Sequence, residues 1–223
     1  MTLEAFLKTH SKITRSLKKF VLDYEAQLDA DTFAAFLENL SEEIKKAAFL
    51  FSEIPAGPER AFKLHALVEE EIAAGANIEV SCTKGCSACC HMEVEVTSYE
   101  ADVIAGLVRE GHVVDRAEGT TVDRERLRAQ SSRSLQDPAW KQGMFNQTNR
   151  CVFLNSEGAC SIYEKRPVMC RRHSVTSPAK NCEDFNAGVT IRYFPKVDLL
   201  ISAANEDSEM QIGPLAKMVQ MRL

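Results

Sequence analysis

The distribution of cysteine is the feature that most constrains this chain. All eight cysteines lie within one stretch of the 223 residues, and the segments before and after it contain none. Ordinary buried cysteines do not cluster with such short spacings. This part of the chain is therefore expected to fold around a shared role of its thiols. The cysteines are Cys82, Cys86, Cys89, Cys90, Cys151, Cys160, Cys170 and Cys182.

The compartment decides what clustered thiols can do. The first residues, "MTLEAFLKTHSKITRSLKKF", contain no continuous apolar run of the export-signal type. No apolar run approaches the roughly 18 residues of a membrane span. We therefore predict a cytoplasmic protein that does not enter a membrane. Disulfides are rare in that compartment, so metal binding or redox chemistry is favoured, and a disulfide framework is the lesser alternative.

The first cysteine segment has the spacing of a metal-binding motif. Thiolates suit soft or borderline metals, and pairs separated by two to four residues commonly place two sulfurs on one metal. Gly85 lets the chain turn between Cys82 and Cys86. Radical S-adenosylmethionine enzymes share the spacing from Cys82 to Cys89. That class is disfavoured because Ala88 replaces its usual aromatic residue, and four more cysteines follow where βα units would be expected.

The adjacent pair Cys89 and Cys90 limits the arrangement further. Neighbouring side chains usually point apart, so we do not expect both thiols on one mononuclear ion. The pair is predicted to serve two sites, or two metals of one cluster. Eight sulfurs allow two four-cysteine sites or a polynuclear centre, and the spacing leaves the pairing open.

Cations surround the second group of cysteines. Positive charge lowers the pKa of a thiol and offsets the negative charge of several thiolates on one metal. Arg166 and Arg171 are the strongest candidates, because each lies beside the cysteine-containing turn. Salt bridges to Glu164 or Asp184 are the alternative. The cations are Arg150, Lys165, Arg166, Arg171 and Arg172.

Apolar residues recur at helical steps through the first 75 residues. One stripe runs from Leu3 to Leu28, a second from Phe33 to Ile54 and a third from Phe62 to Ile72, and each predicts a helix. Helix boundaries are predicted at Asp29 or Asp31, at Gly57-Pro58 and at Gly75.

Short strands and further helices are predicted in the remainder. Residues 92–96 alternate as a strand does, and Thr97 with Glu100 forms a capping box that opens a helix through about Glu110. The charged segment 120–133 is predicted as an exposed helix. Asn155 to Gly158 forms the turn of a β-hairpin with a cysteine on each arm. Later helices are expected near 197–204 and after Pro214.

These elements together predict a mainly α fold with a small β component (α+β). The expected organisation is a helical region over 1–78, a cysteine-cluster metal-binding domain over 79–188, and a C-terminal tail over 189–223 packing on the core. The net charge of -5 argues against a nucleic-acid binder.

The two cysteine segments together resemble the YkgJ-type cysteine-cluster family, also named CxxCxxCC and described as zinc- or iron-chelating domains. The first motif is "CTKGCSACC". The second is "CVFLNSEGACSIYEKRPVMCR", which resembles the family's C-x-F-L…G-x-C-x-I-Y-E-x-R-P-x-x-C-R. The resemblance covers residues 80 to 185, and the helical start and the tail lie outside it. The matching positions are Cys151, Phe153, Leu154, Gly158, Cys160, Ile162, Tyr163, Glu164, Arg166, Pro167, Cys170 and Arg171.

The resemblance implies a zinc or iron site, or an iron–sulfur cluster, built from the eight cysteines. Within it, Arg166 and Arg171 would neutralise charge or hydrogen-bond to sulfur. His91 and His173, next to or shortly after cysteines, are predicted to lie around the ligands, with replacement of a thiol as the lesser alternative. One branch with this motif methylates flagellin lysines with an iron–sulfur cluster and S-adenosylmethionine. This chain is shorter and lacks residues that identify a methyl-donor pocket.

Three functions fit these observations. The first is a metal-binding protein, whose metal is stored, sensed or structural. The second is a redox or group-transfer enzyme, methyltransferase-like, with an iron–sulfur centre, because eight thiols exceed the need of one structural zinc. The third is an interaction module with a protein partner. The sequence contains no Ser-His-Asp pattern, glycine-rich phosphate loop or H-E-x-x-H motif.

Overall fold

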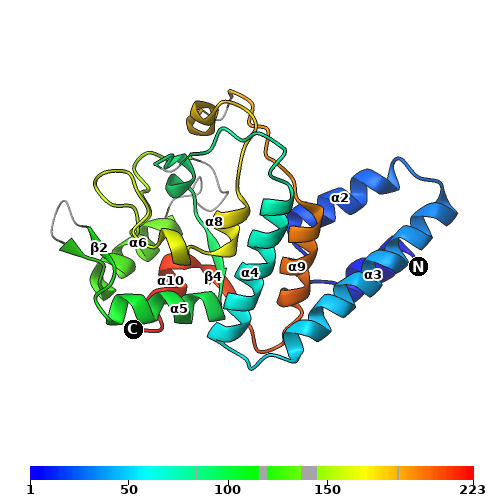
Figure 1. Cartoon of the computed structure of the whole chain (residues 1–223), viewed down its shortest axis with the longest axis horizontal. Coiled ribbons are helices and arrows are strands. Elements are labelled where there is room, and N and C mark those ends of the chain that lie inside the picture. The colour runs from blue at the N-terminus through cyan, green and yellow to red at the C-terminus, as the bar shows by residue number, and fades with distance from the viewer. Residues whose placement is uncertain (84, 116–119, 137–144, 185) are drawn as a thin grey trace. The chain divides into compact units, whose positions relative to one another are not determined.

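The computed structural model describes residues 1–83, 85–115, 120–136, 145–184 and 186–223 (Figure 1). The chain forms two compact units. The first, here called the helical unit, contains residues 1–75 and 193–210. The second, the cysteine unit, contains residues 76–192 and 211–223. The expected C-terminal tail is therefore divided between the two units. The structure is mainly α with a small β component, which confirms the predicted fold class.

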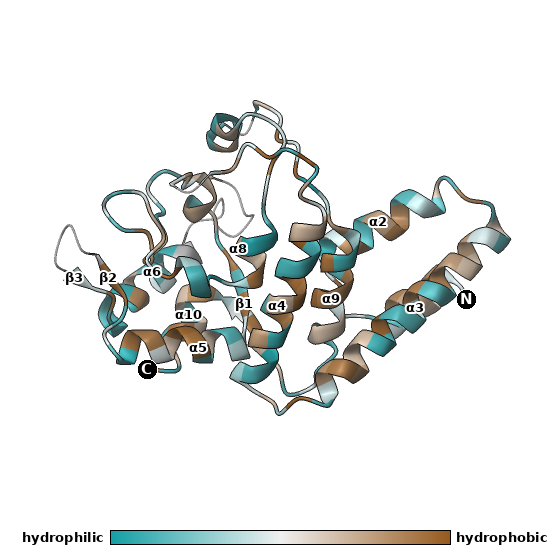
Figure 2. Ribbon diagram, in the orientation of Figure 1, coloured by the Kyte–Doolittle hydropathy of each residue, from teal (hydrophilic) through white to brown (hydrophobic). Residues whose placement is uncertain are grey.

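The helical unit is built around a buried helix from late in the chain. Helix α9 (Pro195–Asn205) packs against α2 (Arg15–Glu25), α3 (Ala30–Ser52) and α4 (Pro58–Ala74). Figure 1 shows α9 lying between α3 and α4. Along α3, apolar and polar residues alternate around the helix (Figure 2), so one face is buried. The buried side chains of this core include Phe6, Leu17, Leu37, Ile44, Val68 and Val197.

The first predicted helix is wrong in its continuity. The stripe from Leu3 to Leu28 is divided into α1 (Leu3–Thr9) and α2. The break lies where the apolar positions step by six, between Leu7 and Ile13. Thr14 begins α2 by accepting the Leu17 N–H, and its own hydroxyl donates to Asp198 of α9 at 2.6 Å. A polar contact with α9 thus ends the stripe there.

Helix boundaries follow the predicted caps. Asp29 caps α3 and accepts the Thr32 N–H at 3.0 Å, while Asp31 lies inside the first turn. Gly57 precedes α4 with a φ of 118°, a conformation that favours glycine, and Pro58 opens the helix. Gly75 ends it. These three boundaries are as predicted.

The cysteine unit contains short strands and short helices. Strand β1 (Glu95–Thr97) pairs antiparallel with β4 (Ile212–Pro214), and β2 (Val114–Asp115) pairs with β3 (Thr120–Thr121). Its remaining elements are α5 (Ser98–Arg109), α6 (Arg124–Gln136), α8 (Val168–Arg172), α10 (Leu215–Gln220) and the 3₁₀ turns η1 (Ala88–His91), η2 (Tyr163–Lys165) and η3 (Ala179–Glu183).

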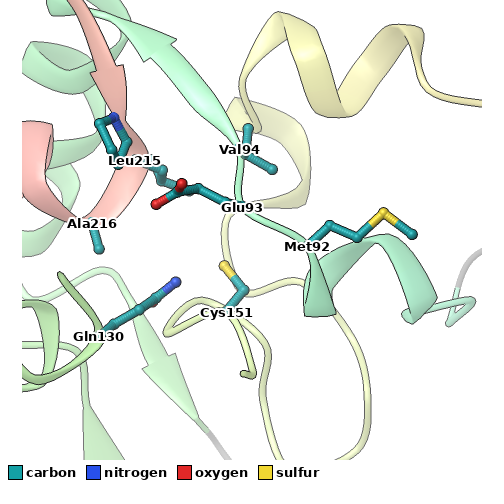
Figure 3. A pocket seen from close by; sticks show the side chains of 8 residues that line it. Met92, Glu93, Val94, Gln130, Cys151, Leu215 and Ala216 are labelled. Carbon is teal, nitrogen blue, oxygen red and sulfur yellow. The ribbon is translucent and has the colours of Figure 1, made fainter. Parts of the chain in front are cut away.

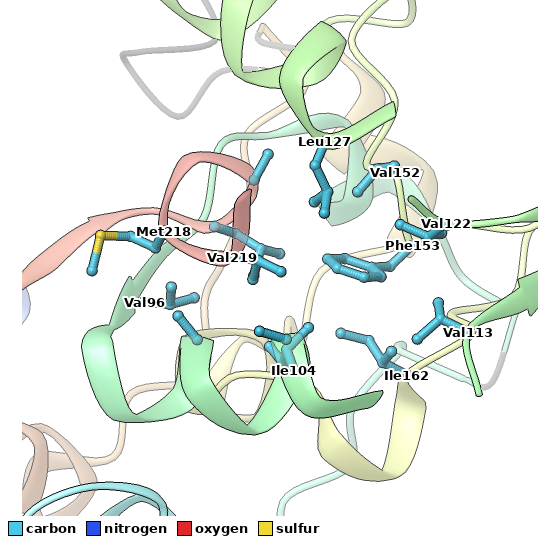
Figure 4. Packing of buried hydrophobic residues seen from close by; sticks show 14 residues of the cluster. Val96, Ile104, Val113, Val122, Leu127, Val152, Phe153, Ile162, Met218 and Val219 are labelled. Carbon is cyan, nitrogen blue, oxygen red and sulfur yellow. The ribbon is translucent and has the colours of Figure 1, made fainter. Parts of the chain in front are cut away.

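The core of this unit lies between α5, α6 and α10. Figure 4 shows Ile104, Leu127, Phe153 and Val219 converging there. The helix predicted over 120–133 is confirmed as α6, but it is not exposed on all sides. Its Leu127, Gln130 and Ser131 are buried, because α10 packs against α6.

The predicted β-strand and β-hairpin are present but shorter than expected. The strand expected over 92–96 begins later, as β1, and the capping box of Thr97 and Glu100 is confirmed. In the hairpin, Gly158 adopts a φ of 76° and the Asn155 N–H donates to the Ala159 carbonyl at 2.8 Å. The two arms pair in one antiparallel bridge, Leu154 with Cys160. Within the described ranges, no helix is both long and apolar enough to cross a membrane.

Candidate metal centre

The first motif is a compact loop tied to a later segment. The Sγ of Cys82 accepts the Val175 N–H at 3.4 Å, and the Ser81 N–H donates to the Val175 carbonyl at 2.9 Å. Gly85 turns the chain with a φ of 95°. The loop then enters η1, which carries both Cys89 and Cys90.

A backbone hydrogen bond joins the two motifs. The Cys151 N–H donates to the Cys90 carbonyl at 2.8 Å. Cys160 lies opposite Leu154 in the bridge of the hairpin turn, so that turn places Cys151 and Cys160 near one another. Segments far apart in the sequence are thus brought together, as the resemblance implied.

Three of the cysteines accept hydrogen bonds from amides two residues further on. The donors are Ala88 to Cys86, Phe153 to Cys151, and Ile162 to Cys160. An N–H that points at sulfur stabilises the thiolate. Burial acts in the opposite direction and dominates: it raises the pKa of all three thiols, that of Cys151 to about 12. These thiols are protonated near neutral pH until something displaces the proton.

Cys170 is placed by a buried carboxylate. Its helix α8 begins at Val168, whose N–H donates to the Oε1 of Glu100 at 2.7 Å. The Oε2 of Glu100 accepts the Thr97 N–H at 2.9 Å. Burial raises the pKa of Cys170 well above its usual value, and negative charge at Cys151, the other neighbouring thiols and Glu100 adds to the rise. Glu100 was predicted as a cap, but nothing in the sequence indicated its contact with α8.

Cys182 lies on η3, which packs against η1. It forms a small buried cluster with Ala88 and Val175, and Cys82 packs against the same cluster. Burial raises the pKa of Cys182, and the charges of Cys82, the other nearby thiols and Glu183 raise it further. The last cysteine of the sequence therefore lies beside the first.

The adjacent pair behaves as one unit. The thiol of Cys90 donates to that of Cys89, which lowers the pKa of Cys89 to about 7 and raises that of Cys90. The two sulfurs thus lie within hydrogen-bond reach, although their side chains were expected to point apart. Cys89 is the thiol most readily ionised near neutral pH.

Arg166 directs its charge at these sulfurs. Its guanidinium carbon lies 4.2 Å from the centre of the Tyr163 ring. The positive charge contributes to the lowered pKa of Cys89 and opposes the effect of burial on Cys160. Within the part of the chain that the structure describes, its buried Nε has no hydrogen-bond partner.

His91 and His173 follow cysteines closely in the chain, His91 at the end of η1 and His173 just after α8. The Nδ1 of His91 is also buried without a partner among the described residues, and its ring contacts Phe145 with the centroids 5.3 Å apart. Burial lowers the pKa of His173, with a further contribution from the charge of Arg172. A neutral imidazole is the form that could bind metal or accept a hydrogen bond.

Other polar groups act on the backbone that carries the cysteines. Arg171 donates to the carbonyls of Arg166 at 2.8 Å and Glu164 at 2.5 Å, so it holds the η2 turn. Gln130 accepts the Val152 N–H at 2.6 Å beside Cys151. A buried glutamine in a charged helix carries no sequence signal for that contact.

A small pocket adjoins this region. Figure 3 shows the side chains of Gln130 and Cys151 beside it, with Glu93 opposite. The remaining lining comes from Met92, Val94 and the start of α10, including Leu215 and Ala216. Cys151 therefore lines this pocket with one face of its side chain.

The donor set fits a soft or borderline metal. All eight cysteines are free thiols. In the described ranges, no three His, Cys, Asp or Glu side chains are already positioned around one ion. Binding thus requires the thiols to rotate toward a common point. The amide donors at sulfur and the buried unpaired atoms of Arg166 and His91 suit a site that gains negative charge.

Eight free thiols gathered in one unit are a donor set of the kind that binds soft or borderline metals. Residues 81–190 match the model of the CxxCxxCC family, which is described as "Putative zinc- or iron-chelating domain". This match confirms the resemblance and covers most of the cysteine unit, while the whole of the helical unit lies outside it. Searches of curated proteins and of solved structures found no match.

Proposed function

We propose that the protein chelates zinc or iron through its eight cysteines, and that it works in a reducing, cytoplasmic environment. One observation carries the proposal. The thiols are close enough for their charges to influence one another's pKa, although they come from four separated segments. These thiols are neutral without metal, and their thiolate forms, gathered in a buried place, would be stable only with a cation among them.

The thiols and Arg166 would have different roles in metal binding. Cys89, whose pKa is lowered by the hydrogen bond from Cys90 and by the charge of Arg166, is the thiol that we expect to ionise first. The thiols whose pKa is raised by burial must release protons as metal enters, so affinity increases with pH. Arg166 neutralises part of the charge at Cys89 and Cys160. The bound metal would supply cross-linking of the surrounding segments.

Anaerobic purification followed by elemental analysis and an absorption spectrum tests the proposal. Zinc gives a colourless protein, and an iron–sulfur cluster gives a brown one. Near-stoichiometric zinc or iron is the expected result. Absence of both metals, in protein purified without chelators, rejects the proposal. Disulfide bonds between the cysteines would then be the favoured alternative.

A redox or group-transfer enzyme with an iron–sulfur centre is the second candidate. The adjacent Cys89 and Cys90, whose thiols hydrogen-bond to each other, favour it, because close sulfurs suit a polynuclear centre. Acid-labile sulfide and a visible absorption band that dithionite bleaches are expected in that case. A colourless zinc protein rejects it.

A further inference from the structure

The cysteines are supported by two different parts of the cysteine unit. Cys82 and Cys182 pack on the small cluster of Ala88 and Val175. Cys86 lies in the same loop, between Cys82 and η1. We call Cys82, Cys86, Cys89 and Cys182 the outer group.

The other cysteines are attached to the main core. Cys151 and Cys160 pack against the large cluster that contains Phe153 and Ile162. Cys90 is bonded to Cys151 through the backbone, and Cys170 is held by the contact of α8 with Glu100. We call Cys90, Cys151, Cys160 and Cys170 the inner group.

The thiols follow the same division. Cys86 and Cys182 are each influenced by Cys82, Cys89 and Glu183. Cys90 is influenced by Cys151 and Cys160, as is Cys170. Cys89 acts on Cys86 and Cys182 and also on all four inner thiols, so it lies at the junction, and we count it with the outer group because that group otherwise has three thiols.

We propose that the two groups hold separate metals, an exchangeable one in the outer group and a retained one in the inner group. This inference rests on the proposed chelating function and adds a division of roles within it. Four thiolates saturate one tetrahedral ion, so eight suit two adjacent ions. The Cys89–Cys90 pair supplies one ligand to each.

The difference in exchange follows from local stability. Segments with few buried apolar contacts open more often than those joined to a main core. Cys82 and Cys182 of the outer group depend on the small cluster around Val175, whereas Cys151 and Cys160 of the inner group pack against the large core between α5, α6 and α10. A chelator should therefore reach the outer metal first.

The test uses the full chain loaded with zinc and mixed with an excess of a chromogenic chelator. We expect about two zinc ions per chain, since each tetrahedral site takes four ligands. They should leave in two phases of similar amplitude. Thiols are alkylated during the first phase and located by mass spectrometry. Cys82, Cys86 and Cys182 should be modified first, while Cys151, Cys160 and Cys170 remain protected.

Matched variants complete the test. Cys182→Ser should remove the fast phase and leave the slow phase unchanged, and Cys170→Ser should remove the slow phase. The alkylation pattern of the unmodified chain needs no variant and decides the matter if Cys170→Ser fails to fold. Release in one phase with all thiols modified together overturns the two-site inference but keeps the chelating function. A chain that binds no zinc or iron overturns both.

Discussion

Single residues determine how the metal-free protein responds to pH. Burial raises the pKa of Cys151 to about 12 and raises that of Cys170 well above the ordinary value of 9.0. The folded state therefore holds these protons more tightly than the unfolded state does. Metal binding must overcome this preference.

We expect the metal-free protein to lose stability as the pH rises above about 9. Below that pH, both states are protonated at these thiols and the contribution to stability is fully present. Above it, the unfolded thiols ionise first, which favours unfolding until the folded pKa is passed. Urea denaturation between pH 7 and 10.5, with reductant and chelator present, measures this. Unchanged stability across that range contradicts the raised pKa values.

Arg166→Gln should raise the pKa of Cys89 in the metal-free protein, because it removes a positive charge that acts on that thiol. Alkylation of Cys89 at pH 7 should slow severalfold. The pH profile of alkylation, followed by mass spectrometry, gives the measurement. Lys165→Gln is the matched control, since that exposed side chain is not among the causes of the shift. Equal profiles in the two variants would show that Arg166 does not act on Cys89.

At the scale of elements, a single buried carboxylate joins α5 to α8. Glu100→Ala removes the acceptor of the Thr97 N–H in the capping box of α5 and the acceptor of the Val168 N–H, so we expect a loss of about 2–4 kcal/mol in unfolding free energy. Chemical denaturation of the metal-free chain measures it. Glu95→Ala, on an exposed position of the adjoining strand, should change stability little. A similar effect of both substitutions would contradict the anchoring role.

Helix α3 offers a direct test of the helical core. Leu37 is fully buried and Leu50 is 59% exposed on the same helix. Leu37→Ala should cost about 2–5 kcal/mol, because it removes packed methyl groups and leaves a cavity. Leu50→Ala should change stability by less than about 0.5 kcal/mol. Thermal unfolding of both variants compares them, and equal melting temperatures would contradict the assigned faces.

Elements whose signals are local could be predicted from the sequence. The Asp29 and Thr97 caps, Gly57-Pro58 and the Gly158 turn each depend on residues within a few positions. The break before Thr14 has a local signal in the wider apolar step and the Thr14 cap, whereas the contact of Thr14 with Asp198 in a distant helix could not be predicted. The contacts of Glu100 with Val168 and of Gln130 with Val152 could not be predicted either, because each joins residues far apart in the sequence. The eight cysteines could be named because their spacing is itself the signal, whereas their use as ligands stays a prediction.

The whole molecule consists of two units, and all eight cysteines lie in the same one, the cysteine unit. If metal binding is coupled to folding, Cys160→Ser should lower metal content and weaken the cysteine unit while the helical unit keeps its structure. Hydrogen exchange mapped along the chain measures this: amides of 76–192 should exchange faster, and those of α3 and α9 should not change. Glu157→Ala, at an exposed position of the same hairpin turn, is a control that keeps every thiol. Full metal content with unchanged exchange would remove Cys160 from the ligands.

The hydrogen bond from Cys151 to the Cys90 carbonyl also has a kinetic consequence. The chain leaves the first motif after Cys90 and returns to the same point at Cys151. Packing of α5 and α6 on α10 closes this long excursion, so its loop-closure entropy is already offset without any ion. The segments that carry Cys90 and Cys151 are thus already adjacent when a metal ion binds. Its capture rate is set by deprotonation and by rotation of thiol side chains, not by a diffusive search of the polypeptide for its own distant segments.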